Sequence, residues 1–289
     1  MSQAKLALFV ALGVFAVVFV GYWVASARTL AARLLEALIG FVTNFFDTLG
    51  IGSFATTTSI YKLFHMVPDE HIPGTLNIGH ALPTVVQAFI FIAAVQVAMP
   101  TLIAMILASV LGAWLGAGVV AGLPRRAIQI GMGAALLVAA MLFAASNLNL
   151  MPGGGEAMSL DGWRFWAGIA GNFVLGALMT LGIGLYAPCM ILVYLLGMHP
   201  LAAFPIMMGS CAFLMPVGSL RFIAKRSYEE YPALGLALGG VPAVLIAALI
   251  VKSLPVRTLR WGVVVVVLYT AGAMLYSALR ERGAQQPSS

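Results

Sequence analysis

Long runs of hydrophobic residues, separated by short polar segments, occupy almost the whole chain. Each run has about 20 residues or more, the length that a helix needs to cross a membrane. The runs lie at 5–27, 34–66, 74–97, 99–122, 127–146, 165–198, 203–224, 231–251 and 258–279. We therefore predict an all-α polytopic membrane protein, in which the first run is retained as a transmembrane helix.

Composition supports this class and excludes several others. Of 289 residues, 62% are hydrophobic and 8% are charged, whereas soluble domains carry roughly 25% charged residues. The chain has no room for a separate soluble domain, and its net charge of +6 reports loop orientation rather than nucleic-acid binding. Both cysteines lie in apolar runs without metal-ligand spacing, and no nucleotide-binding G-x-x-x-x-G-K-[ST] occurs. We expect no cofactor, metal or nucleic-acid partner.

Two of the runs, 34–66 and 165–198, are too long for ordinary spans. A continuous helix of 33 residues would extend about 50 Å, beyond the roughly 30 Å hydrocarbon core. Each run contains a Gly-Ile-Gly sequence, at 50–52 and 182–184, where glycine permits a sharp change of backbone direction. Each is therefore either a broken, tilted span or a re-entrant hairpin of two half-helices.

The two breaks belong to an internal duplication. Residues 48–73 and 180–205 align without a gap at an offset of 132, with ten identities in 26 positions. The identical positions in the first copy are Thr48, Leu49, Gly50, Ile51, Gly52, Ala55, Leu63, Met66, Pro68 and Pro73. We predict an N-terminal helix (1–30), a first repeat (31–147), an inter-repeat loop (148–162), a second repeat (163–280) and a disordered tail (281–289).

The basic residues favour inverted repeats. If each broken run is a hairpin, each repeat crosses the membrane three times, and ten basic residues face one side against five on the other. The larger group is Arg28, Arg33, Lys62, Arg125, Arg126, Arg221, Lys225, Arg226, Arg280 and Arg282. If each broken run crosses the membrane, the basic residues divide almost evenly. The positive-inside rule favours the hairpins.

Inverted repeats with broken helices are typical of secondary transporters, whose sites lie near the midplane between the repeats. A half-helix that begins after the glycines directs its N–H groups and positive dipole end inward, which suits an anion. Hydroxyl groups beside the breaks suit the same ligand. The candidate binding residues are Thr48, Gly50, Gly52, Ser53, Thr56, Thr57, Asn77, His80, Thr180, Gly182, Gly184, Tyr186 and Ser210. The alternative is a pair of packing kinks without a ligand.

Four segments resemble the TauE/SafE family of sulfite exporters, also called 4-toluene sulfonate uptake permeases. They are the Gly-Ile-Gly repeats, PDEHIPGTLNIGHALPT at 68–84 and LGMHPLAAFPIMMGSCAFLMP at 196–216. The resemblance covers about 34–280. It implies a carrier of the bacterial inner membrane that moves sulfite, a sulfonate or a related oxyanion and is coupled to the proton gradient. It fixes neither the substrate, nor the direction, nor the oligomeric state.

Two ionisable residues could carry the coupling proton. Asp47 precedes the first break, where a membrane-embedded carboxylate could bind a proton or cap the turn. His80 shares a helical face with Asn77, Thr84 and Gln87. It could carry a proton, or this face could form interhelical hydrogen bonds.

Charged residues nearer the ends of the runs suggest simpler roles. Arg221 is either an interfacial anchor or a gate that attracts anions. Lys62 is expected to snorkel, and the acidic segment 69–71 is expected to be a solvated turn rather than a metal site.

Two rival functions remain. An anion channel could share this fold. An intramembrane serine hydrolase could pair Ser53 with His80, but the second repeat has Leu185 at the position of the serine and keeps the glycines. This pattern preserves backbone geometry rather than a nucleophile, so we expect a protein that is not an enzyme.

Overall fold

The computed structural model describes residues 2–250 other than 51, 151–154 and 183, together with eight positions between 264 and 279. Within these residues the secondary structure is helical, without a strand. Most of the expected span at 258–279 and all of the expected tail at 281–289 lie outside the described residues. So does the central isoleucine of each Gly-Ile-Gly.

The expected runs correspond to helices with small shifts at their ends. The helices are α1 (Gln3–Ser26), α2 (Leu34–Thr48), α3 (Ser53–Leu63), α4 (Ile72–Ala94), α5 (Met99–Val120), α6 (Arg125–Asn147), α7 (Gly162–Met179), α8 (Tyr186–Leu195), η1 (Pro200–Ala202), α9 (Ala203–Lys225) and α10 (Glu230–Ile250). Both overlong runs are interrupted at the glycines, so that 34–66 contains α2 and α3 and 165–198 contains α7 and α8.

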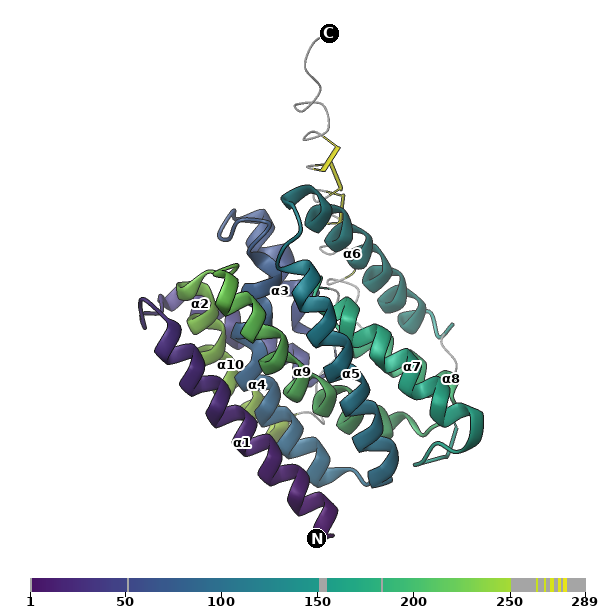
Figure 1. Ribbon diagram of the computed structural model, residues 1–289. Coiled ribbons are helices and arrows are strands. Elements are labelled where there is room, and N and C mark those ends of the chain that lie inside the picture. Colours follow the sequence, from purple (N-terminus) through teal and green to yellow (C-terminus); the bar gives the residue numbers. More distant parts are fainter. Residues whose placement is uncertain are drawn as a thin grey trace.

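Among the described residues, five helices are long and apolar enough to cross a membrane: α1, α4, α5, α9 and α10. The chain is therefore a multi-pass membrane protein. In Figure 1, α1 follows the outer edge of the bundle and α9 crosses its centre. This agrees with burial, since most of α9 is enclosed by protein and most of α1 is not.

Hydrogen bonds between loops define two ends of the bundle. At one end, the backbone N–H groups of Arg28 and Thr29 donate to Glu230, and His71 lies 2.8 Å from a carboxylate oxygen of Glu229. We call this end, formed by residues 27–33, 64–71, 121–129 and 225–230, the basic end. The opposite end is formed by 95–101, 155–161 and 196–202, where Ala98 bonds to Met158 and His199 bonds to Ala157.

The broken segments are hairpins that open at different ends. α2 begins beside the basic end, and α3 returns to it, because Lys62 near the end of α3 contacts Asp69 in the loop before α4. α7 begins and α8 ends beside the opposite end, where Gly155 bonds to Met198. The tips of the two hairpins, at 47–52 and 180–184, therefore both lie inside the bundle.

Small residues allow the hairpins to pack closely against long helices. α2 packs on α10, where Gly40 and Gly239 leave no room for a Cβ atom against the facing backbone. α7 packs on α5 in the same way, at Gly112 and Gly176. Close backbone approach of this kind is the usual means by which membrane helices associate. At the centre, α4 packs against α9.

A buried ion pair at the basic end corrects two expectations. Lys62 does not snorkel: its Nζ lies 2.6 Å from Oδ2 of Asp69. The turn at 69–71 is not fully solvated either, because Asp69 is 4% exposed and its Oδ2 also accepts a hydrogen bond from Gln129 of α6. The pair ties the returning arm of the hairpin to the following loop and to α6.

We expect Lys62→Met to destabilise the protein by up to about 3–5 kcal/mol, because it removes a cation that lies 2.6 Å from a buried carboxylate. Thermal unfolding in detergent would measure this change. In the double variant Lys62→Met/Asp69→Leu, much of the lost stability should return, since neither charge remains buried.

The matched control is Lys5→Met. Lys5 lies at the start of α1, where its Nζ donates to the carbonyl of Ala93, and its loss should cost less than about 1 kcal/mol. Equal losses in Lys62→Met and Lys5→Met would show that the ion pair does not stabilise the fold.

Candidate functional site

The two hairpin tips are turns that depend on left-handed glycines. Gly50 and Gly52 have φ values of 81° and 85°, and Gly182 and Gly184 have values of 89° and 72°. L-residues with a Cβ atom adopt this region at a cost, so glycine is suited to these positions. The second tip also contacts the first hairpin, because Gly184 lies against Phe54 in the first turn of α3.

Asp47 occupies the N-terminus of α3. Its Oδ1 accepts a hydrogen bond of 2.5 Å from the backbone N–H of Ser53, the first residue of that helix. The first N–H groups of a helix lack intrahelical partners and carry a partial positive charge, which a carboxylate complements. Asp47 is 2% exposed. The turn-capping interaction considered for this residue is therefore present.

Gln87 connects this carboxylate to the second half of the chain. Its Nε2 donates to Oδ2 of Asp47 at 2.9 Å and to Oγ1 of Thr48 at 3.0 Å. Its Oε1 accepts a hydrogen bond from the hydroxyl of Tyr186, the first residue of α8. All four side chains are buried. A continuous polar chain thus runs from the first hairpin through α4 to the second.

His80 forms a second buried link, between α4 and both arms of the first hairpin. Its Nδ1 lies 3.0 Å from Oδ1 of Asn44, and its Nε2 lies 3.1 Å from Oγ1 of Thr57. The amide of Asn44 donates through Nδ2 to the carbonyl of Gly40, so its Oδ1 acts as an acceptor. Nδ1 of His80 therefore carries the proton, and in the neutral ring Nε2 accepts from the hydroxyl of Thr57.

The structure brings together only part of the expected site. Asp47, Thr48, Ser53, Thr57, His80 and Tyr186 belong to the two chains just described. Three other expected residues use their side chains within their own helices. Thr56 donates to Ser53, Asn77 to Pro73 and Thr180 to Ala177, in each case to a backbone carbonyl. Sequence reasoning had placed Gln87 on the polar face of the helix with His80 without counting it as a site residue.

Ser210 belongs to a different polar cluster. Its Oγ accepts a hydrogen bond of 2.9 Å from Nδ2 of Asn172, which also donates to the carbonyl of Met105. This cluster joins α5, α7 and α9. Sequence reasoning missed Asn172, although an amide within an otherwise apolar stretch of α7 was a usable signal.

Arg221 lies on the exposed surface of α9 rather than among the buried residues at the tips. Its guanidinium lies over the ring of Trp114 in α5, 5.2 Å from the centroid. A guanidinium stacked on an exposed tryptophan near a helix end is typical of interfacial anchors.

Neither the hydrolase geometry nor a metal cluster is present among the described residues. The ring nitrogens of His80 contact Asn44 and Thr57 rather than Ser53. No group of three or more His, Cys, Asp or Glu side chains in this part of the chain could hold a metal ion.

Comparison with known proteins gives one result. The sequence model of a family described as Sulfite exporter TauE/SafE matches residues 35–274. No curated protein and no solved structure matches the chain significantly.

We expect Gly52→Ala to destabilise the protein by about 1–3 kcal/mol, because the backbone at Gly52 (φ 85°, ψ 129°) lies in a region that residues with a Cβ atom rarely adopt. No neighbouring atom would meet this Cβ within 4 Å, so the loss would report backbone strain alone. The control is Gly118→Ala within α5, which also has open space and should be neutral or stabilising because alanine favours a helix. Similar melting temperatures for both variants would contradict the proposed need for a left-handed residue at the tip.

Proposed function

The chain belongs to the Sulfite exporter TauE/SafE family, and from this premise we propose that it exports a small sulfur-containing oxyanion, such as sulfite or an organosulfonate. It would act as a proton-coupled secondary transporter in the bacterial inner membrane. The observation that carries the proposal is the buried Asp47 carboxylate of the first hairpin tip, which accepts a hydrogen bond from the first backbone N–H of α3.

We propose that the halves are inverted repeats. Helix packing supports this. If α2, α4 and α5 of the first half are matched with α7, α9 and α10 of the second, each of these helix contacts has a counterpart. α2 packs on α10 as α7 packs on α5, and α4 packs on α10 as α9 packs on α5. The hairpins open at opposite ends, which is the relation expected of inverted repeats.

The distribution of charge supports one orientation. Seven basic residues with described side chains lie at the basic end or within four residues of it, and two lie beside the opposite end. The first group is Arg28, Arg33, Lys62, Arg126, Arg221, Lys225 and Arg226, and the second is Lys5 and Arg164. By the positive-inside rule, the basic end faces the cytoplasm. Residues of the first hairpin would then line the cytoplasmic route to the tips, and those of the second would line the outer route.

The oxyanion would bind between the tips. α8 begins at Tyr186 behind Leu185, without a side chain that caps its first N–H groups. These groups could serve as donors to an anion, while the hydroxyl of Tyr186 is already bonded to Gln87. The N-terminus of α3, in contrast, already holds Asp47. The two half-helix ends therefore differ: one is open, and the other carries an internal carboxylate.

This difference supplies a means of coupling. An ionised Asp47 would repel an oxyanion at the neighbouring helix end, whereas a protonated Asp47 would not. Proton and anion would then promote each other's binding and cross the membrane in the same direction, as one half rocks against the other. Net export would require the outward gradient of the anion to exceed the inward gradient of protons.

The test is anion flux in proteoliposomes, with sulfite, sulfoacetate, taurine and sulfate compared with and without a pH gradient. The wild type should show saturable flux that rises when the side holding the anion is acidified, by at most about tenfold per pH unit for one proton. Asp47→Asn should lose this pH dependence, because its carboxamide does not titrate.

The matched control is Asp161→Asn, which makes the same change at an exposed position beside α7 and should keep the wild-type pH dependence. Downhill flux without gradient-driven accumulation would instead indicate an anion channel. Absence of flux for every sulfur anion would overturn the proposed substrate class.

A further prediction separates the roles of Asp47 and His80. Both described partners of the His80 ring nitrogens are uncharged, so we expect His80→Ala to slow transport through lost hydrogen bonds but to retain its pH dependence. The same flux assay would measure both quantities. Loss of the pH dependence in His80→Ala, together with its retention in Asp47→Asn, would assign the proton to the histidine.

A further inference from the structure

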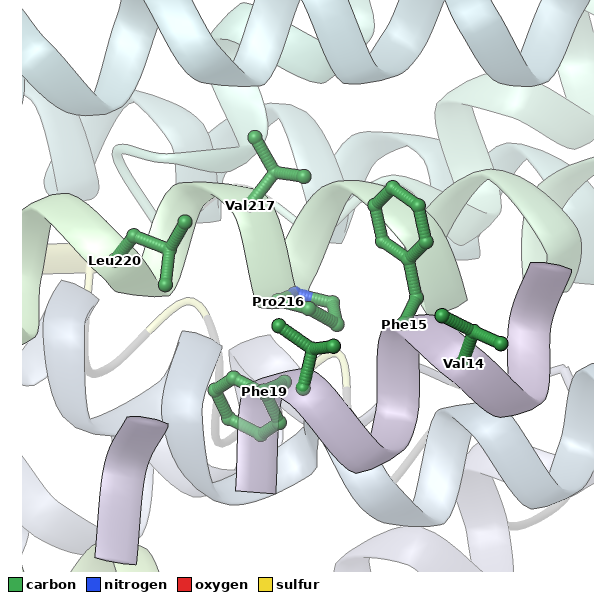
Figure 2. A pocket seen from close by; sticks show the side chains of 7 residues that line it. Val14, Phe15, Phe19, Pro216, Val217 and Leu220 are labelled. Atoms are coloured by element: carbon green, nitrogen blue, oxygen red, sulfur yellow. The ribbon is translucent and has the colours of Figure 1, made fainter. Parts of the chain in front are cut away.

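An apolar groove lies between α1 and α9, on the outside of the bundle. Its cavity of about 150 Å³ is lined by Val14, Phe15, Val18, Phe19, Pro216, Val217 and Leu220. Figure 2 shows these side chains on the two helices, with Phe15 of α1 and Pro216 of α9 facing the space between them. No polar side chain lines the groove.

The groove faces the bilayer rather than the transport site. Val18 is 63% exposed and Leu220 is 39% exposed, and both belong to helices that are apolar enough to cross a membrane. An apolar cavity of this size remains dry and accepts apolar ligands. At this depth in a bilayer, hydrocarbon chains of lipids are the abundant apolar ligands.

Basic side chains lie where the groove approaches the basic end. Arg221 follows the groove residue Leu220 directly, and Lys225 lies one turn further along α9. Between them, the exposed side chain of Ala224 is small and leaves room along the surface of the helix. Arg28, at the corresponding end of α1, is also exposed.

Among the described residues, no acidic side chain forms an ion pair with Arg221 or Lys225. Arg221 stacks on Trp114, and Nζ of Lys225 lies 3.4 Å from the carbonyl of Gly118. Two acidic residues follow α9. Glu229 lies 2.8 Å from Nδ1 of His71, and Glu230 accepts from the backbone of Arg28 and Thr29 and lies 3.9 Å from Arg226. The end of the groove therefore carries an excess of positive charge.

We infer that this groove is a binding site for one anionic phospholipid of the leaflet at the basic end. One acyl chain occupies the groove between α1 and α9, and the phosphate contacts Arg221 and Lys225. The distance fits: from Pro216 to Lys225 the helix rises about 13 Å, close to half of the roughly 30 Å hydrocarbon core. The guanidinium and ammonium groups suit a phosphate oxygen. The lipid would fill the seam between α1, which lies outside both repeats, and the central helix α9.

Native mass spectrometry of the full-length protein, released from nanodiscs, tests the site. Phosphatidylglycerol and phosphatidylcholine with the same acyl chains are compared. One phosphatidylglycerol should be retained in preference to phosphatidylcholine. Arg221→Gln and Lys225→Gln should each reduce this preference about fivefold, the effect of one basic residue near an anionic headgroup. Val217→Phe, which fills the groove, should abolish retention of both lipids.

The matched control is Arg164→Gln at the opposite end. Arg164 also stacks on a tryptophan, with its guanidinium 5.8 Å from the ring centroid of Trp163, and its loss should leave retention unchanged. Equal retention of the two lipids, equal effects of Arg164→Gln and Arg221→Gln, or a dimer that excludes lipid from this face would overturn the inference. If Val217→Phe does not fold, retention by the wild-type protein is compared for phosphatidylglycerol with six-carbon and with sixteen-carbon chains. A groove site requires the long chain, so only the sixteen-carbon lipid should be retained.

Discussion

The hydrogen bond from the backbone N–H of Ser53 to Asp47 allows a helix to restart within apolar surroundings. Backbone groups at membrane depth must find partners inside the protein, since lipid offers none. Once the carboxylate is fixed there, its second oxygen orients Gln87, and Gln87 in turn accepts from Tyr186 of the other hairpin. The polar chain that joins the halves therefore depends on one capping interaction, and this interaction brings an acid to the place where the proposed substrate binds.

The two halves share the same backbone turns but differ in the polar side chains at their tips. Equivalent glycines turn both hairpins, yet the first tip is followed by Ser53 beside a carboxylate and the second by the apolar Leu185. His80 and Nε2 of Gln87 form their hydrogen bonds with residues of the first half, whereas the second half contributes the hydroxyl of Tyr186. In the proposed transporter, the first half holds the proton and the second leaves a helix end open for the anion. The similar backbones of the two halves would allow them to rock against each other, and the different side chains at their tips would couple proton binding to anion binding.

Hydrophobic patterning was sufficient to predict the helices and the two breaks, because span length and left-handed turns constrain local sequence. The polar face of α4 was also predictable, and two of its members, His80 and Gln87, hold the buried chains together. Pairings between distant segments were not predictable. Lys62 and Asp69 each suggested a solvated residue until the returning arm brought them to 2.6 Å. Thr56 and Thr180 resembled ligand donors, but a short hydroxyl in a helix can bond to its own preceding turn, and single-sequence reasoning does not distinguish the two outcomes.

The exchange of packing partners between the halves has a consequence for biosynthesis. α2 packs chiefly on α10, which ends at Ile250, about 200 residues later in the chain. At 5–20 residues per second, the ribosome needs roughly 10–40 s to produce that partner. During this interval α2 carries Glu36, which is buried in the finished protein and lies against Gly235 of α10, without the surface that encloses it. The packing surface of the first hairpin is therefore complete only after α10 has been made. Although the halves resemble each other in sequence, they mature as one interdependent unit, because a helix made late completes the packing of one made early.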